Sequence, residues 1–254
     1  READSDAIID EITAAYVKRR GTVPLNLMPK HGNTNTITGV SEVSLKKFLG
    51  GNWKPLIDLI VAGEIKGVAG VVGCSNLTFG GHDVLTVELT KELIKRDIIV
   101  LSAGCSSGGL ENCGLMAPEA AELAGPKLKA ISKSLGIPPV LNFGPCLAIG
   151  RLEIVATELA EAIGVDLPQM PLVLSAPQWL EEQALADGAY GLALGLPLHL
   201  GEPPFITGSS LVTKILTEDM KSLTGGQVII DPDGASAADK LEKIIMEKRA
   251  ALNI

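Results

Sequence analysis

Three cysteines stand at the ends of apolar segments that have the length of β-strands. Cys74 follows "KGVAGVVG", Cys105 follows "DIIVLSAG", and Cys146 follows "PPVLNFG" and one proline. Thiolates are soft ligands that favour zinc, copper(I) or iron–sulfur clusters. The alternative is a packing role, because a free cysteine also behaves as a small buried hydrophobic residue. Three of the four cysteines in equivalent positions favour a binding site.

The residues around these cysteines suit close backbone approach. Gly73 and Gly104 precede the first two, and a Gly-Pro pair precedes the third. Glycine lets the backbone approach a bulky group, and backbone N–H groups in such loops can stabilise thiolates or sulfides. Three thiolates alone leave a metal site incomplete, and the lack of a C-x-x-C pair argues against a zinc ribbon. The fourth cysteine, Cys113, lies eight residues after Cys105, where helical spacing carries it away from that edge.

Apolar strands alternate with amphipathic helices along most of the chain. The expected strands cover 66–73, 97–104, 138–144, 170–176, 196–201 and 226–231. The expected helices cover 41–49, 53–64, 82–96, 117–136 with a break or kink at Pro126, 148–164, 177–195, 209–225 and 236–252. This alternation predicts an α/β fold, a Rossmann-like doubly wound parallel sheet with helices on both faces. The carboxyl ends of its strands meet at one edge, so the three thiols should converge there.

The first part of the chain has a different character. Residues 1–20 show helical spacing of apolar side chains, and 21–39 form a loop rich in Gly, Pro, Asn and Thr. We therefore expect residues 1–40 to be a helix plus linker, a remnant of a preceding domain. Residues 41–254 should form the α/β domain that carries the three cluster cysteines.

Composition excludes several classes of protein. The chain has 254 residues, is 46% hydrophobic and has only 3% aromatic residues, so its core must be aliphatic. A net charge of −8 with interspersed signs argues against nucleic-acid binding. No apolar run reaches the roughly 18 residues of a membrane span, and no secretory signal is present. These features favour a cytoplasmic protein, and the missing initiator methionine indicates a fragment or a processed product.

One competing motif is "GCSSG" at 104–108, which matches the nucleophile elbow of serine hydrolases. It would make Ser106 the nucleophile, with Asp166 or Asp187 and His199 as partners. However, "SSGGLEN" is a poor helix start, and His199 falls inside an expected strand. Neither G-x-G-x-x-G nor a Walker A pattern occurs, so nucleotide binding has little support.

Longer segments carry a resemblance to a known family. They include "KPLIDLIVAGEIKGVAGVVGCSN", "SAGCSSGGLENCGLMAPE", "PPVLNFGPC" and "LGLPLHLGEPPFITGSSLVTKILT". Together with the amino- and carboxyl-terminal segments they resemble the carboxyl-terminal portion of nickel–iron carbon monoxide dehydrogenases, over essentially the whole chain. Hybrid cluster proteins are more distant relatives with a similar domain, but the segments after Cys146 look more like the dehydrogenase.

The resemblance implies a cofactor and a reaction. In the family, Cys74 and Cys105 fall on iron-binding positions of a nickel–iron–sulfur cluster, and Cys146 falls on the nickel-binding position. The implied reaction is CO + H2O to CO2, two electrons and two protons, under anaerobic conditions. The electrons pass to a ferredoxin-like carrier. A homodimer or a missing amino-terminal half would complete the site.

The chain also departs from the family pattern. Gln183 stands where the family has a catalytic lysine, and glutamine cannot carry a proton or a positive charge there. The turn before Cys146 reads "NFGPC" where the family usually has His-Met-Gly-Ser-Cys. The family's amino-terminal half, with further ligands, is absent. We therefore expect oxidoreductase activity that is impaired or absent in this chain alone. The alternative is a non-catalytic α/β module that binds a partner or a different, hybrid-cluster-like iron–sulfur cluster.

Overall fold

The computed structural model describes residues 2–22 and 35–254 of the chain. Its contacts divide the chain into two units, Arg1–His31 and Gly32–Ile254. The first unit contains helix α1 (Glu2–Arg19), which confirms the helix expected over residues 1–20. Most of the loop expected over 21–39 lies outside the described residues. No described helix is long and apolar enough to cross a membrane.

The second unit starts earlier than the expected boundary at residue 41. The backbone N–H of Ile37 donates to the carbonyl of Met116 at 2.9 Å, and that of Val40 donates to the carbonyl of Asn142 at 2.8 Å. These bonds pair residues 35–40 with one loop and with the last residue of strand β3 (Val140–Asn142), so this segment contacts the α/β unit.

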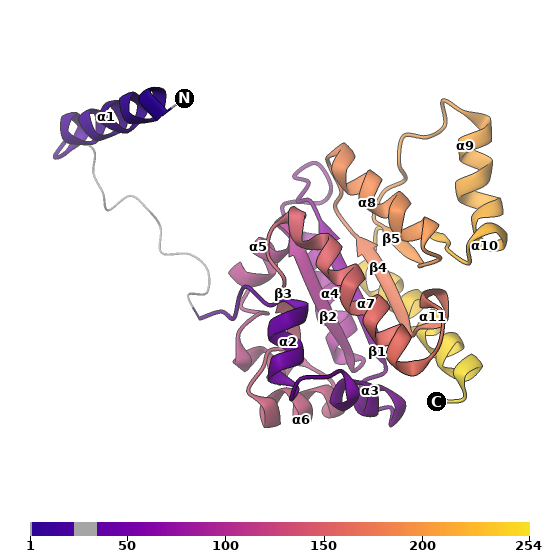
Figure 1. Cartoon of the computed structure of the whole chain (residues 1–254). Helices are drawn as coiled ribbons and strands as arrows, with labels where there is room; N and C mark the ends of the chain where they lie inside the picture. Colours follow the sequence, from indigo (N-terminus) through magenta and orange to yellow (C-terminus); the bar gives the residue numbers. More distant parts are fainter. Residues whose placement is uncertain (1, 23–34) are drawn as a thin grey trace. The chain divides into compact units, whose positions relative to one another are not determined.

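Within residues 35–254 the strands form one six-stranded sheet, in the order β3-β2-β1-β4-β5-β6, with every pair parallel (Figure 1). The strands are β1 (Gly67–Gly73), β2 (Ile98–Gly104), β3 (Val140–Asn142), β4 (Leu172–Ala176), β5 (Leu198–Leu200) and β6 (Val228–Ile230). This is the strand order of a Rossmann-type sheet. Successive strands are added on one side of β1 up to β3, and on the other side from β4 onward. The predicted α/β fold is therefore confirmed.

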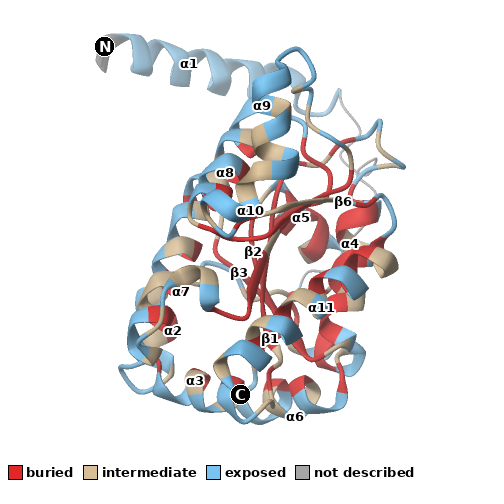
Figure 2. Ribbon diagram, turned by 90° about the vertical axis from the view of Figure 1, so that its right-hand side faces the viewer, coloured by how far each residue is buried: buried red, intermediate tan, exposed pale blue. Residues whose placement is uncertain are grey.

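Helices cover both faces of the sheet, as Figures 1 and 2 show. One face carries α2 (Glu42–Phe48), α3 (Lys54–Val61), α7 (Ile149–Ile163) and α8 (Glu182–Ala193). The other face carries α4 (Val84–Lys95) and α11 (Gly234–Leu252), which pack against each other. The central strand β1 is buried along its whole length, as expected for a sheet with two covered faces. The remaining helices are α5 (Cys105–Asn112), α6 (Pro126–Leu135), α9 (Ser210–Lys214) and α10 (Met220–Leu223), the last two joined by a π-helical turn.

Pro126 interrupts the helical segment expected over 117–136. A 3-10 helix covers Pro118–Leu123, and α6 begins anew at Pro126. Proline is well tolerated at the first helical position, where its missing N–H has no partner in the helix. The break predicted from the sequence is therefore present.

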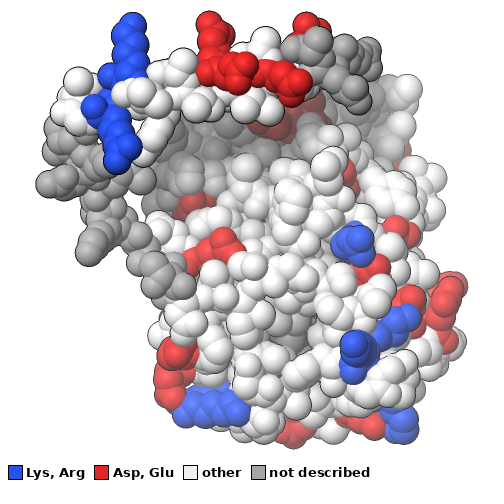
Figure 3. Space-filling view, turned by 60° about the vertical axis from the view of Figure 1, so that its left-hand side comes forward, with Lys and Arg blue, Asp and Glu red and all other residues white. Residues whose placement is uncertain are grey.

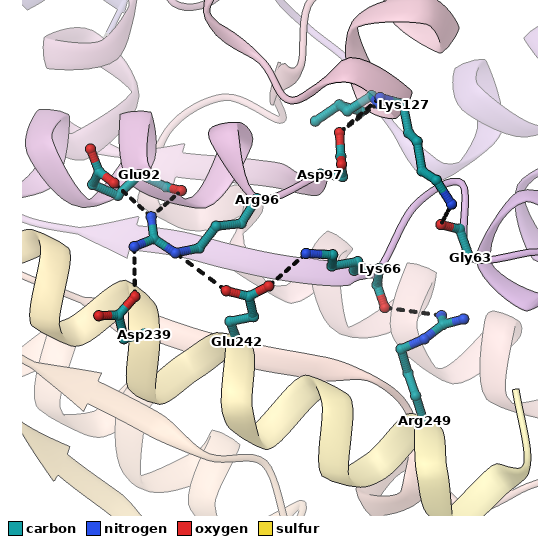
Figure 4. Close-up of polar contacts among 10 residues, drawn as sticks. Gly63, Lys66, Glu92, Arg96, Asp97, Lys127, Asp239, Glu242 and Arg249 are labelled. Carbon is teal, nitrogen blue, oxygen red and sulfur yellow. Dashed lines mark hydrogen bonds and ion pairs between the residues drawn. The ribbon is translucent and has the colours of Figure 1, made fainter.

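Hydrogen bonds and ion pairs connect α11 to residues at the amino-terminal end of the sheet (Figure 4). Arg249 is almost fully buried, and its Nη1 donates to the carbonyl oxygens of Ile60 at 2.7 Å and Lys66 at 3.1 Å. It therefore adds a side-chain hydrogen bond to the Ile60 carbonyl near the end of α3, which also accepts from the Gly63 N–H at 3.0 Å. Glu242 bridges Lys66 at 2.6 Å and Arg96 at 3.3 Å. This end of the sheet is thus anchored by contacts between segments far apart in the sequence.

A partly buried cation on α11, Lys248, leads to a prediction of pH dependence. The Nζ of Lys248 donates to the Leu172 carbonyl at 3.2 Å, and burial lowers the pKa of Lys248 to about 8. The unfolded chain holds this proton up to about pH 10.4. Below pH 8 the folded state therefore bears a buried charge, and this penalty disappears as the pH rises from 8 to about 10.4. We expect Lys248→Met to raise the Tm at pH 7 by about 2–6 °C, and by much less at pH 10.

Thermal unfolding followed by circular dichroism at both pH values checks this expectation. The matched control is Lys243→Met on the same helix, where the side chain is exposed. A gain for Lys248→Met that is the same at pH 7 and pH 10 would contradict the assigned cause.

Candidate metal centre

The carboxyl ends of three neighbouring strands carry the three predicted thiols. Cys74 directly follows β1, Cys105 is the first residue of α5 after β2, and Cys146 opens the short 3-10 segment Cys146–Ala148 after β3. The register of β1 and β2 places Gly73 opposite Gly104. The N–H of Gly104 donates to the carbonyl of Gly144 at 2.9 Å. Backbone pairing therefore brings the three cysteine positions side by side.

Gly104 sets the closest approach at this edge. Its backbone has φ 86° and ψ −162°, a conformation that only glycine adopts readily. A Cβ added there would lie 2.9 Å from the Gly73 oxygen and 3.2 Å from the Cys146 Sγ. The sulfur of Cys146 therefore packs directly over the Cα of Gly104. A larger residue at position 104 would push this thiol away from β2.

The three thiols influence one another electrostatically. Burial is the largest effect that raises the pKa of the Cys105 thiol, followed by the neighbouring Cys146 and Cys74 and, more weakly, by Glu181. The sulfurs of Cys146 and Cys74 thus disfavour ionisation of Cys105, which is itself exposed at this edge. A bound cation would instead favour the ionised form of the thiol, so the thiol would release its proton as the cation binds. The arrangement is thus one in which metal binding and deprotonation are coupled.

The thiols suit a cluster better than a single ion. Among the described residues, no three Cys, His, Asp or Glu side chains are grouped tightly enough to hold one metal ion. In a [4Fe–4S] cluster each thiolate binds a different iron, so the ligands surround the cluster instead of meeting at one point. The cysteines are all free, and Cys74 is buried while Cys146 is partly exposed. The residues therefore fit part of the ligand set of an iron–sulfur-type cluster.

The fourth cysteine lies away from this edge. Cys113 is the C-cap of α5, whereas Cys105 is its first residue. Its side chain is exposed, and it is not among the groups that shift the pKa of Cys105. The expectation that helical spacing carries Cys113 away from the strand ends is confirmed.

The start of α8 faces the same edge. Cys74 belongs to one buried cluster with Ala176 and Ala184, and a Cβ on Gly73 would lie 3.9 Å from the Ala184 Cβ. Gln183 lies in the first turn of α8 and is exposed, and its Nε2 donates to Asp187 Oδ1 at 3.0 Å. Gln183 is therefore next to Ala184, which packs in the same buried cluster as Cys74.

An apolar cavity of about 260 Å³ lies between α7, α8 and the sheet. Its lining includes Gly73, Leu174 and Ala176 from the sheet, and Asp187 from α8. It lies at the boundary between β1 and β4, where strand order reverses and Rossmann-type folds bind ligands. Sequence reasoning missed this cavity because helix-to-sheet spacing depends on tertiary packing. The small residues Gly188 and Gly191 on α8 indicate close packing instead, because an added Cβ would lie 2.8 Å from Leu198 Cδ2 and 2.5 Å from Leu174 Cδ1.

The hydrolase alternative is not supported by the geometry of its residues. Ser106 is fully buried, and its hydroxyl donates to the Gly73 carbonyl at 3.3 Å. The two ring nitrogens of His199 contact Ser175 Oγ at 2.7 Å and the Asp231 carbonyl at 2.9 Å. The described side chains therefore form no Ser106–His199 pair.

The expectation that 106–112 would be a poor helix was wrong. This segment lies within the regular helix α5. A Cβ on Gly109 would lie only 2.3 Å from the Cγ of the buried Asp83. Tertiary packing that requires a glycine thus overrides the low helix propensity of the segment.

The fold and these thiol positions define a Rossmann-like α/β domain with three thiols at the carboxyl edge of its sheet. Residues 1–235 match the model of the Prismane/CO dehydrogenase family. The chain therefore belongs to the Prismane/CO dehydrogenase family.

Individual relatives agree with this assignment. The chain is 59% identical to a carbon monoxide dehydrogenase of Methanocaldococcus jannaschii, over 97% of this chain and 39% of the relative. It is 46% identical to a carbon monoxide dehydrogenase of Methanopyrus kandleri, over 100% of this chain and 40% of the relative. A nickel-free crystal structure of the enzyme from Thermococcus sp. AM4 matches with a TM-score of 0.83 and 43% identity, over 86% of this chain and 34% of that chain. The chain thus spans about two fifths of the length of these curated relatives.

Proposed function

We propose that this chain is part, or a divergent relative, of an anaerobic carbon monoxide dehydrogenase. The reaction is CO + H2O to CO2, two electrons and two protons. The observation that carries the proposal is the placement of Cys74, Cys105 and Cys146 on three adjacent strand ends, in a chain of the Prismane/CO dehydrogenase family. The named relatives at up to 59% identity support the oxidoreductase assignment.

The three cysteines would hold a nickel–iron–sulfur cluster, with Cys146 on nickel and Cys74 and Cys105 on iron. When bound, such a cluster supplies Lewis-acidic metals and accepts electrons. Strand pairing fixes the thiols, and Gly104 allows Cys146 to approach β2 closely. The neighbouring cavity has a mostly apolar lining that includes Gly73, the residue before Cys74.

Other groups must complete this site. Three thiolates are fewer ligands than a cluster needs, so the remainder would come from a missing amino-terminal half or from a second copy of the chain. The electrons would pass to a ferredoxin-like carrier, and we propose a cytoplasmic location.

Acidic and basic side chains are interspersed over the α/β unit in Figure 3, without a concentrated basic area on that face.

Metal content tests the proposal most directly. The protein is purified without oxygen, both as this chain and as the complete protein, and iron, nickel and zinc are counted per chain. We expect several irons with nickel in the complete protein, together with CO-dependent reduction of a viologen dye. A complete protein with neither nickel nor CO oxidation would contradict the proposal.

The glutamine at position 183 leads to a kinetic prediction. Because glutamine cannot carry a proton, we expect CO oxidation in the complete protein to be slow. Gln183→Lys should raise kcat by roughly 100-fold, the usual scale of general acid–base catalysis. Glu182→Lys, which adds the same charge at the neighbouring exposed position, is the control and should leave kcat unchanged. An unchanged rate in Gln183→Lys would show that this position does not limit the reaction.

One observation favours the second candidate, a module with a hybrid-cluster-like site or a partner-binding role. The described site has thiols but no side chain at position 183 that can carry a proton. Under this alternative the complete protein would contain iron without nickel. Metal counting therefore separates the two functions.

A further inference from the structure

Asp187 is a carboxylate with one satisfied and one orphaned oxygen. It lies one helical turn after Gln183 on α8, and its Oδ1 accepts the Gln183 Nε2–H at 3.0 Å. Its Oδ2 is buried and has no hydrogen-bond partner among the described residues. A buried carboxylate oxygen without a partner destabilises the folded state. Such an arrangement is expected where a group is retained for something other than stability.

The orphaned oxygen belongs to a residue that lines the apolar cavity. The other ionisable groups in the lining are Glu153 on α7 and Tyr190 on α8. The lining also includes Gly73 and Ala184, the residues that pack around Cys74. Asp187 and Gly73, the residue directly before Cys74, therefore line the same cavity.

We propose that Asp187 accepts a proton at this site, in the role that the family resemblance gives to a lysine at position 183, and that Gln183 positions its carboxylate. This inference rests on the proposed function. Oxidation of one CO by one water releases two protons and two electrons. One proton goes to Asp187 Oδ2, the other goes to water, and the electrons leave to the ferredoxin-like carrier. The carboxylate becomes a neutral carboxylic acid at Oδ2, the oxygen that has no hydrogen-bond partner among the described residues. The proton then passes to bulk water at the exposed side of α8.

The rival explanation is a purely structural side-chain pair at positions i and i+4 of α8. A double-mutant cycle in the cluster-loaded complete protein separates the two. We expect Asp187→Asn to lower kcat by about 100-fold when residue 183 is glutamine. In the Gln183→Lys background, the lysine carries the proton, so the same change should lower kcat by less than about 5-fold. A structural role would give equal losses in both backgrounds.

The pH profile supplies a second readout. If Asp187 accepts a proton in the reaction, the pH profile of kcat should have a different shape in Asp187→Asn than in the wild-type protein. A structural pair would leave the shape of the profile unchanged while changing its height.

A third readout needs neither metal nor activity. In this chain without its cluster, Asp187→Leu should raise the Tm by roughly 2–6 °C, because leucine replaces an orphaned oxygen at an apolar wall. Ala186→Leu, at the exposed neighbouring position, controls for the helix propensity of leucine and should change the Tm little. A lower Tm in Asp187→Leu would show that the carboxylate stabilises the fold, and would overturn the inference.

The outcomes also separate the two proposals. A complete wild-type protein that holds its cluster but does not oxidise CO would overturn the proposed function, and this inference with it. A wild-type protein that oxidises CO, together with an Asp187→Asn variant of equal rate and pH profile, would overturn only the role of Asp187.

Discussion

Cys146→Ala is expected to remove nickel and to lower CO oxidation by more than about 100-fold in the complete protein. Loss of a group behind a metal ligand already lowers affinity or activity by about 10–100-fold, so loss of a ligand itself should exceed that range. Cys146 packs over Gly104 at the end of β2, and another thiol cannot take its place because Cys113 lies at the far end of α5. Metal analysis and the viologen assay, performed on the same preparation, measure both effects.

Two comparisons show that the loss is specific. Cys113→Ala is the matched control, because it removes an exposed thiol from the same part of the fold and should leave metal content and activity unchanged. Cys146→Ala should also leave the Tm of the cluster-free chain within about 2 °C, because Cys146 is only partly buried and the change is small. Full nickel content in Cys146→Ala would show that Cys146 is not the nickel ligand.

The thiol-bearing edge could be predicted because it depends on local patterns. Short apolar runs that alternate with amphipathic helices specify parallel strands, and parallel strands place their carboxyl ends at one edge. The positions of Cys74 and Cys105 at that edge follow from the ends of two such runs. The break at Pro126 could be predicted for the same reason, since a proline restricts its own backbone whatever surrounds it.

The features that were missed depend on contacts between distant segments. Gly109 looks like a helix breaker until Asp83, 26 residues earlier, is seen to occupy the space of its missing Cβ. Arg249 looks like a surface cation of an amphipathic helix, but it donates to the carbonyl of Ile60, 189 residues away. The sequence indicates Asp187 only as a possible partner of Ser106, not as a residue of the thiol-bearing edge. Its orphaned oxygen follows from the gap between α7 and α8, whose width no local pattern specifies.

Gly104→Ala is expected to destabilise the α/β unit by about 3 kcal/mol and to displace the thiol of Cys146. About 1–3 kcal/mol comes from forcing a non-glycine residue into a conformation with φ 86° and ψ −162°. The rest comes from overpacking, because the new Cβ would lie 2.9 Å from the Gly73 oxygen, a backbone atom of the paired strand. For a chain of this size the Tm should fall by roughly 6–12 °C.

Gly164→Ala distinguishes this local effect from a general effect of removing glycine. Gly164 has φ 79° and ψ 36° at the end of α7, and a Cβ there would meet no atom within 4 Å. We expect a loss of only about 1–2 kcal/mol in this variant, from backbone strain alone. Its cluster should be retained, because no thiol lies near. Equal losses of stability in the two variants would mean that the contact with Gly73 is relaxed easily. Loss of nickel in Gly104→Ala but not in Gly164→Ala would instead show that the conformation of Gly104 determines the position of the Cys146 thiol. It would also explain why a glycine stands directly before Cys105, at the end of β2.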